Sequence, residues 1–196
     1  MNDQYFSREP SAASRPAACA YTYRGHALRC ATDSGVFSRG ELDSGTRLLL
    51  DALPENLTGD VLDLGCGWGA VGVALARLNP GLQLVMSDVN ERALALAASN
   101  ARRNGVEAVT CLSDGFDAVE GLFDHVVTNP PIRAGKAVIY GLFAASRERL
   151  KPGGTLTIVI RTQQGAPSAL KFLKETFSQA DDVARGGGYR ILRAVR

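Results

Sequence analysis

Three glycines at alternate positions, directly after an apolar segment, constrain the fold of this chain most strongly. The apolar residues 61–64 are followed by Gly65, Gly67 and Gly69, and a helical pattern begins near Ala70. Because glycine has no Cβ, a ligand can lie directly over the backbone of such a turn, and the turn can adopt positive φ angles. The order of strand, glycine turn and helix therefore predicts a cofactor-binding turn.

Acidic residues at the ends of two apolar segments indicate which cofactor this turn binds. A dinucleotide site spaces its glycines as G-x-G-x-x-G and sets a pyrophosphate on the helix N-terminus, whereas the spacing here is D-x-G-x-G-x-G. Asp63 would repel a pyrophosphate but can attract the cationic amino group of S-adenosylmethionine. Asp88 follows the apolar residues 82–86 and can accept hydrogen bonds from both ribose hydroxyls, as acids in NAD enzymes also do. We expect Asp63, Asp88 and the adjacent Val89 to bind S-adenosylmethionine.

The sequence Asn129-Pro130-Pro131 follows a third apolar strand and indicates the reaction. In an open parallel sheet, the carboxyl ends of the strands face the ligand crevice. Proline lacks a backbone donor and keeps the preceding residue out of the helical region, so this loop presents carbonyl groups. The Asn129 side-chain oxygen and the Pro130 carbonyl can hold both hydrogens of a planar amine and aim its lone pair at a methyl group. These three residues are the candidate catalytic residues, with alignment and electrostatics supplying the rate.

Several longer motifs resemble those of the RsmC-like class I methyltransferases. They are residues 35–38, 42–46, the glycine turn, 129–136, 163–166 and 187–190, within a resemblance that covers about residues 20–196. It implies a Rossmann-like, doubly wound and mostly parallel sheet of seven strands with an antiparallel last strand. It also implies S-adenosylmethionine as donor and the N2 amine of a guanine in small-subunit ribosomal RNA as acceptor.

Two features depart from that family pattern. Its bacterial rRNA enzymes carry a second, degenerate methyltransferase-like half before the catalytic one, whereas we expect only a short leader here. Ile132 stands where an aromatic residue often stacks on the target base. We expect Ile132, its neighbours Arg133 and Lys136, and Phe37 to contact the substrate.

Each candidate residue also has a structural alternative. Asp63 could cap the helix after the turn, and Asn129 could initiate a turn, as Asn-Pro commonly does. Trp68 could pack in the core as readily as line the donor pocket. Asp114 follows the fourth apolar segment and could contact adenine or cap a loop. Core packing is the default role of Phe37, although the resemblance suggests that it closes over the donor or the base.

Functions from three classes stay open at this point. The first is an RNA guanine-N2 methyltransferase, and the second is a methyltransferase for another planar group, such as protein glutamine N5 or DNA adenine N6. The third is an RNA-interaction module that binds S-adenosylmethionine without turnover, which the intact Asp63, Asp88 and Asn129 argue against. The glycine spacing disfavours a nicotinamide oxidoreductase.

Composition fits one enzyme domain that needs no metal. With 196 residues, 45% of them hydrophobic, the chain can bury a substantial core. We expect residues 1–18 to form a flexible tail and residues 19–196 a single methyltransferase domain. The four cysteines show no metal-binding spacing, which predicts free thiols in the cytoplasm. No apolar run approaches the ~20 residues that span a bilayer.

The net charge of +2 leaves RNA binding to local basic patches. Arg133 and Lys136, beside the Asn-Pro-Pro loop, are the first candidates. Further candidates follow the predicted sixth strand or lie near the end of the chain: Arg161, Arg185, Arg190, Arg193 and Arg196. Each of these charges could equally be a solvated surface residue.

Strand and helix patterns alternate along the chain. They predict a hairpin over residues 21–31, a helix over 43–53, strands near 60–64, 82–87, 106–111, 123–128 and 154–160, and helices near 70–78, 91–104, 137–150 and 166–177. Two last strands, over 181–185 and 188–195, are expected to supply an antiparallel edge. This order argues for a doubly wound sheet.

Overall fold

The computed structural model describes residue 8 and residues 10–196, without the side chain of Arg133. Seven strands form one sheet in the spatial order β5-β4-β3-β6-β7-β9-β8. Five of these strands run parallel to one another: β3 (Asp60–Leu64), β4 (Gln83–Asp88), β5 (Val109–Leu112), β6 (Phe123–Thr128) and β7 (Leu150–Arg161). The predicted α/β fold with a mostly parallel seven-stranded sheet is confirmed.

The last strand is antiparallel, as predicted, and the last two strands together supply the antiparallel edge of the sheet. β9 (Tyr189–Val195) lies between β7 and β8 (Gln179–Gly186) and pairs antiparallel with both. Gly187 and Gly188 close the β8–β9 hairpin with φ angles of 54° and 80°, a conformation that glycine adopts without strain. The edge strand on this side is therefore β8.

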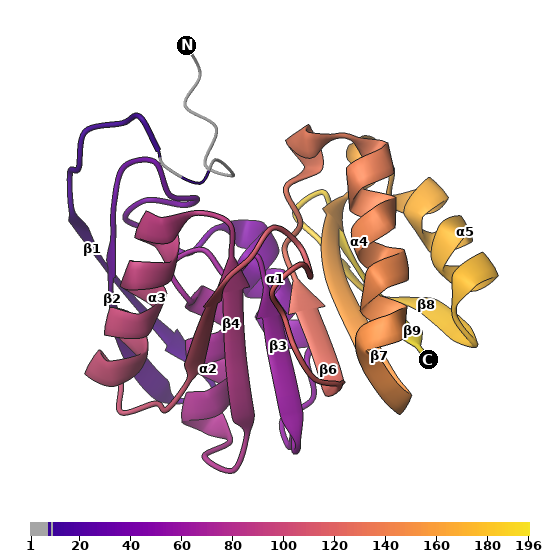
Figure 1. Cartoon of the computed structure of the whole chain (residues 1–196), viewed down its shortest axis with the longest axis horizontal. Coiled ribbons are helices and arrows are strands. Elements are labelled where there is room, and N and C mark those ends of the chain that lie inside the picture. The colour runs from indigo at the N-terminus through magenta and orange to yellow at the C-terminus, as the bar shows by residue number, and fades with distance from the viewer. Residues whose placement is uncertain (1–7, 9) are drawn as a thin grey trace.

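Helices cover both faces of the sheet (Figure 1). One face packs against α1 (Ser44–Ala52), α2 (Ala70–Leu78) and α3 (Glu91–Arg103), and the other against α4 (Lys136–Arg149) and α5 (Ala166–Thr176). Successive strand residues point to opposite faces. Val61 accordingly belongs to the hydrophobic cluster with α1, α2 and α3, and Leu62 to the cluster with α4 and α5. This confirms the doubly wound arrangement.

A two-stranded hairpin precedes the sheet, as predicted. β1 (Ala17–Tyr23) and β2 (His26–Thr32) pair through a tight turn at Arg24 and Gly25, whose φ angles are 44° and 83°. The side chain of Asn100 on α3 both donates to the carbonyl and accepts from the N–H of Ala31 at 2.7–2.8 Å. Asn104 does the same with Arg29 at 3.0 Å. Two side chains one helical turn apart thus hold the hairpin against α3.

Part of the leader contacts the body of the protein. Ala17 and Ala18 belong to β1, and the Asp33 carboxylate accepts from Ser14 Oγ at 2.6 Å and from the Arg15 N–H at 2.5 Å. The Arg92 guanidinium donates to the carbonyl of Ala12 at 2.8 Å. Ala12, Ser14 and Arg15 thus contact polar groups of the body, and the hairpin begins within the predicted tail, whose flexibility stays a prediction. Residues 1–7 and 9 lie outside the described residues.

The strand predicted at residues 106–111 begins later than its apolar pattern suggests. β5 starts at Val109, whereas Val106 is buried directly after α3 and donates its N–H to the carbonyl of Ala101 at 2.9 Å. Gly105, with φ of 65°, allows the chain to turn there. An apolar residue that follows the glycine at the end of a helix packs back on that helix. The hydrophobic Val106 therefore marks the end of α3 and not the start of a strand.

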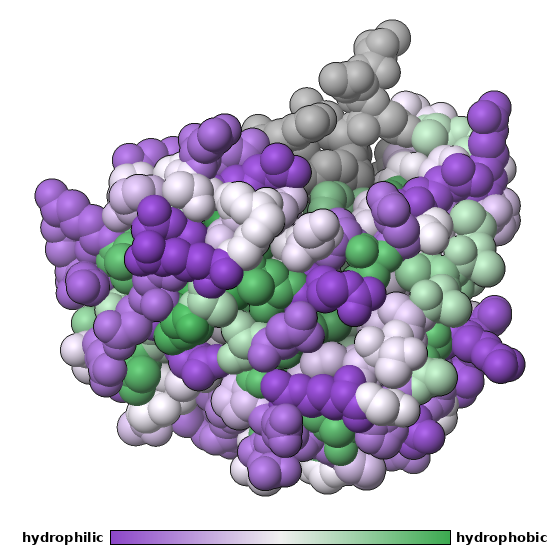
Figure 2. All heavy atoms as spheres, turned by 180° about the vertical axis from the view of Figure 1, so that it is seen from behind, coloured by the Kyte–Doolittle hydropathy of each residue, from purple (hydrophilic) through white to green (hydrophobic). Residues whose placement is uncertain are grey.

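The surface of the described residues is mixed in character. On the face opposite to that of Figure 1, hydrophilic side chains surround and separate the hydrophobic ones (Figure 2). Large apolar side chains that remain exposed are Phe37, Val109, Leu122, Val138 and Val183. Across residues 8 and 10–196, every helix is too short or too polar to traverse a bilayer.

Candidate active site

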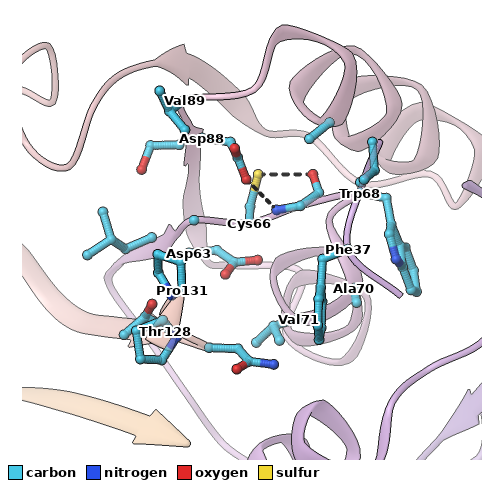
Figure 3. A pocket seen from close by; sticks show the side chains of 18 of the residues that line it. Phe37, Asp63, Cys66, Trp68, Ala70, Val71, Asp88, Val89, Thr128 and Pro131 are labelled. Atoms are coloured by element: carbon cyan, nitrogen blue, oxygen red, sulfur yellow. Dashed lines mark hydrogen bonds between the residues drawn. The ribbon is translucent and has the colours of Figure 1, made fainter. Parts of the chain in front are cut away.

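The carboxyl ends of the parallel strands meet at the upper edge of the sheet in Figure 1, where a cavity of about 280 Å³ opens. Figure 3 shows Phe37 on one side of this space and Thr128 and Pro131 on the other. Most residues predicted for the site line the cavity: Phe37, Asp63, Gly65, Gly67, Trp68, Asp88, Val89, Asp114, Asn129, Pro130 and Pro131. Residues from five separate loops thus converge, as expected at this edge of an open sheet.

The first two glycines of the turn leave room for a ligand. Gly65 and Gly67 have φ angles of 68° and 55°, and no atom lies within 4 Å of the position that a Cβ would take at either residue. Both line the cavity, so a Cβ would project into space that a ligand can use. The third glycine has another role. A Cβ on Gly69, the N-cap of α2, would lie 3.2 Å from the Ala97 Cα, so this glycine permits α2 to approach α3.

Asp88 is held in one orientation by two backbone donors. Its Oδ2 accepts from the Gly67 N–H at 2.7 Å, and its Oδ1 accepts from the Asn90 N–H at 2.8 Å. Burial raises the pKa of Asp88, and the backbone donors partly offset this effect. The carboxylate therefore faces the cavity from the end of β4 with a fixed position, as binding of two ribose hydroxyls requires.

Asp63 contacts the helix after the turn and also lines the cavity. Its Oδ2 accepts from the Gly72 N–H at 2.8 Å, so it satisfies a donor in the first turn of α2, and it also lines the cavity. The carboxyl group is 2% exposed, and burial raises its pKa to about 7, with a further contribution from the charge of Asp88. A cation in the cavity would favour the charged form. This is the environment that a ligand ammonium group would complete.

Trp68 likewise packs in the core and lines the cavity. Its ring meets Tyr21 edge to face, with centroids 6.0 Å apart and planes at 70°. Its carbonyl accepts from the Asn100 side chain at 2.9 Å, and the Tyr21 hydroxyl donates to the carbonyl of Ala70 at 2.6 Å. Tyr21 of the hairpin therefore packs against the glycine turn and the start of α2.

Asn129 lies on the cavity wall directly after β6. Its Nδ2 donates to Thr46 Oγ1 at 3.0 Å, a contact between residues 83 positions apart. Pro130 and Pro131 line the cavity beside it. The Pro131 carbonyl accepts from the Ala134 N–H at 2.8 Å, which closes the short helix η1 (Ile132–Ala134).

Three of the predicted substrate residues lie away from the cavity wall or cannot be placed. Ile132 packs against the hydrophobic cluster of α4 and α5, because η1 turns its apolar side chain toward that cluster. The Lys136 ammonium lies 5.1 Å from the centroid of the Tyr140 ring. The side chain of Arg133 lies outside the described residues. Among the three whose side chains the structure describes, Phe37 alone is part of the wall, and it is 38% exposed.

Two polar residues that the sequence analysis missed hold the loops of the site. Asn90 is buried; its side chain donates to the Gly35 carbonyl at 2.9 Å and accepts from the Ala93 N–H at 3.1 Å. It thereby ties the loop that carries Phe37 to the start of α3. Thr46 is the second. The only indication of Thr46 in the sequence was its place in the motif at residues 42–46. This motif resembles one of the family, but its residue types do not indicate a reaction.

Most of the C-terminal arginines are engaged within the chain. Arg185 and Arg190 pair with Asp182, Arg193 donates to the carbonyl of Ala52, and Arg196 donates to the carbonyl of Leu150. Arg161 is exposed, and its guanidinium lies 4.8 Å from the centroid of the Tyr189 ring. Within the described part of the chain, neither Arg161 nor Lys136 forms an ion pair with a carboxylate. Lys136 begins α4 after the Asn-Pro-Pro loop, and Arg161 ends β7, which pairs with β6.

The described residues contain no group of three or more His, Cys, Asp or Glu side chains arranged to hold a metal ion. The four cysteines, Cys19, Cys30, Cys66 and Cys111, are free thiols. Burial raises the pKa of the Cys66 thiol well above its usual value, so the cysteine in the glycine turn is protonated. The other ionisable side chains that line the cavity, among those the structure describes, are the carboxylates of Asp43, Asp63, Asp88 and Asp114.

The sequence of the methyltransferase small domain family matches residues 27–193, which include every motif of the cavity wall. The chain belongs to this family. Its resemblance to the RsmC-like class I methyltransferases is confirmed, and the family depends on S-adenosylmethionine.

Two relatives show how far the sequence similarity extends. YbxB of Bacillus subtilis, an uncharacterized protein, is 42% identical over 200 residues, and the match covers 100% of both chains. Ribosomal RNA small subunit methyltransferase C of Shewanella amazonensis is 38% identical over 161 residues, which is 80% of this chain and 46% of that protein.

A solved structure extends the comparison to three dimensions. The T. thermophilus 16S rRNA N2 G1207 methyltransferase (RsmC), in complex with AdoMet and guanosine, matches with a TM-score of 0.83 and 28% identity. The match covers 94% of this chain and 51% of that one. The chain thus spans about half the length of both named methyltransferases.

Proposed function

We propose that this protein methylates the exocyclic N2 amine of a guanine in small-subunit ribosomal RNA, in the cytoplasm, with S-adenosylmethionine as donor. The observation that carries the proposal is the position of Asn129 on the wall of the cavity that Asp63 and Asp88 also line. An acceptor for amine hydrogens and a site for a cationic cofactor therefore share one space. The similarity to a 16S rRNA methyltransferase solved with AdoMet and guanosine supports this substrate class.

The residues of the cavity fit the donor. Gly65 and Gly67 leave open space above the turn, where side chains would obstruct a ligand. Asp88 would accept from the ribose hydroxyls, and Asp63 would face the ammonium group. Bound S-adenosylmethionine supplies a methyl group activated by a sulfonium. Asp114, which also lines the cavity, is the proposed neighbour of the adenine.

Asn129 and Pro130 would orient the acceptor. The lone pair of a guanine N2 amine is delocalised into the ring, so the amine is a weak nucleophile that must be aligned. Asn129 Oδ1 and the Pro130 carbonyl accept from its two N–H groups and turn the lone pair toward the methyl group. The new N–C bond would replace the S–C bond of the sulfonium, which leaves as a neutral thioether. The nitrogen becomes acidic only as the N–C bond forms, and its surplus proton then passes to solvent. Alignment therefore replaces a strong base.

The target base would enter beside two exposed apolar side chains. Phe37 and Val138 line the cavity and are 38% and 52% exposed. An enzyme that modifies a base takes it out of its stack and holds it against apolar or aromatic side chains. We assign the stacking role to Phe37, since Ile132 packs in the hydrophobic cluster. Lys136 and Arg161 would contact phosphates of the flanking nucleotides.

Nucleoside mass spectrometry of small-subunit ribosomal RNA tests this function. RNA from a strain that lacks the gene and from its parent would be digested and compared, with a complemented strain as control. We expect N2-methylguanosine to decrease in the deletion strain by one residue per subunit and to return on complementation. Equal N2-methylguanosine in all three strains would contradict the proposal, as would loss of a different methylated nucleoside instead.

A further inference from the structure

The contact between Thr46 and Asn129 joins two motifs that lie far apart in the sequence. Asn129 Nδ2 donates to Thr46 Oγ1 at 3.0 Å. Thr46 is 4% exposed in the first turn of α1, and both residues line the cavity. A buried polar contact at this place constrains a side chain that the proposed reaction uses.

The two ends of an asparagine amide have opposite hydrogen-bonding properties. Its oxygen accepts, whereas its nitrogen donates twice. Rotation of the Asn129 amide by half a turn would therefore present N–H groups to an acceptor amine that itself offers N–H groups. In the structure, Nδ2 donates to Thr46 Oγ1, so the amide has the opposite orientation. Its Oδ1 is then available to accept from a ligand in the cavity.

We propose that Thr46 is a positioning residue that sets the Asn129 amide so that its oxygen, and not its nitrogen, meets the acceptor amine. This inference rests on the proposed function for its chemistry. It also assigns a purpose to the motif at residues 42–46. Under this assignment, α1 is part of the catalytic apparatus, although it precedes the first strand of the large sheet.

The first turn of α1 is built to hold Thr46 in place. The Asp43 carboxylate accepts from the N–H groups of Gly45 and Thr46 at 3.0 and 3.1 Å, which caps the helix. A Cβ on Gly45 would lie 2.8 Å from Cε1 of Tyr189, so the absence of a side chain lets α1 pack closely on that ring. Tyr189 itself is paired with Arg161 in the β7–β9 ladder. Asp43, Gly45 and Tyr189 thus place the Thr46 hydroxyl relative to the end of the neighbouring strands.

The side chain of Thr46 is itself stiff. Two heavy atoms on its Cβ restrict χ1 in a helix. Valine has nearly the same shape and lacks the hydroxyl, whereas serine keeps the hydroxyl and lacks the methyl group. The pair Thr46→Val and Thr46→Ser therefore separates the hydrogen bond from the packing.

Single-turnover kinetics with small ribosomal subunits from the deletion strain test the inference. We expect Thr46→Val to slow methyl transfer by about tenfold, because a misoriented polar contact loses its contribution to alignment. Thr46→Ser should transfer within about twofold of the wild-type rate. The affinities for S-adenosylmethionine and for the subunit should be unchanged in both variants. Thr157→Val is the matched control, since it removes another buried hydroxyl, one that accepts from Arg193 instead.

A double-mutant comparison shows whether Thr46 acts through Asn129. In the Asn129→Ala background there is no amide to orient, so Thr46→Val should cause no further loss of rate. The same tenfold loss in both backgrounds would overturn the inference, as would a wild-type rate in Thr46→Val.

The orientation can also be measured without any RNA. In the ¹⁵N spectrum of the protein alone, we expect the side-chain amide protons of Asn129 to exchange slowly with solvent in the wild type and in Thr46→Ser. They should exchange quickly in Thr46→Val. Equal exchange in all three proteins would overturn the positioning role. If the wild type methylates no RNA, the proposed substrate is wrong, while the exchange measurement still decides whether Thr46 holds the amide.

Discussion

Gly67 donates its backbone N–H to the carboxylate of Asp88 at 2.7 Å, and this bond joins the glycine turn to the end of β4. The turn after β3 and the acid at the end of β4 are therefore joined before any ligand arrives. Preorganised polar groups of this kind bind without the cost of being ordered on contact. The two halves of the proposed donor site depend on each other through this bond.

Replacement of Asp88 by alanine should weaken donor binding. The change removes the proposed acceptors for the ribose hydroxyls and frees the N–H groups of Gly67 and Asn90. We expect a loss of about 2–3 kcal/mol in the binding free energy of S-adenosylmethionine, the scale of hydrogen bonds to charged groups. Isothermal titration calorimetry measures it, with NAD and ATP as competitors that should have no effect. Tight binding of NAD without binding of S-adenosylmethionine would contradict the assigned cofactor.

Donor binding should depend on pH through Asp63. Burial raises the pKa of this carboxyl to about 7, and a cationic ligand selects its ionised form. Below pH 7 the protein must release a proton to bind, so affinity should fall by about fivefold between pH 7 and pH 6. Calorimetry in buffers of different ionisation enthalpy should detect the released proton. An affinity that stays constant over this range would show that Asp63 does not pair with the donor.

The same shift predicts how stability depends on pH. Because the pKa of Asp63 is higher in the folded protein than in the unfolded chain, the folded state binds a proton more tightly. Its contribution to the free energy of unfolding is fully present below about pH 4 and is lost as the pH rises through about 7. Asp63→Asn cannot titrate. The unfolding free energy of this variant, measured in urea across this pH range, should therefore not decline as the pH rises through about 7. A pH profile equal to that of the wild type would contradict the raised pKa of Asp63.

RNA binding should respond to the cations beside the Asn-Pro-Pro loop. Lys136→Ala and Arg161→Ala should each weaken binding of the small ribosomal subunit RNA and reduce the salt slope by about one unit, the effect of one lost phosphate contact. Donor affinity should not change. Arg185→Ala is the control, since Arg185 is also exposed but pairs with Asp182 on the edge strand. Equal slopes in all four proteins would place the RNA surface elsewhere.

Local sequence patterns were sufficient to predict the sheet and the ends of two of its central strands. The segments at 60–64 and 123–128 match β3 and β6 residue for residue, because their apolar runs and the turn residues after them are local properties. Asp63, Asp88 and Asn129 were found because chemistry at strand ends follows from the topology. These are the parts of the site that a single segment determines.

Contacts between distant segments could not be predicted in this way. The bond from Asn129 to Thr46 and the close approach of Gly69 to Ala97 depend on how helices pack on the finished sheet. Gly69 has the spacing of a ligand-binding glycine, yet its lack of a side chain serves helix packing. The contacts of Asp33 and Arg92 with residues 12–15 have no local signal either, since they depend on polar groups of the folded body.

Transfer of a labelled methyl group in a single turnover tests the proposed reaction most directly. The substrate is the small ribosomal subunit from the deletion strain, and the RNA is digested to nucleosides after the reaction. The wild-type protein should place the label in N2-methylguanosine. Asn129→Ala should slow transfer by about 100-fold or more with donor affinity nearly intact, and Asn129→Asp should keep partial activity. A wild-type rate in Asn129→Ala, or label recovered in protein and not in RNA, would contradict the proposed reaction.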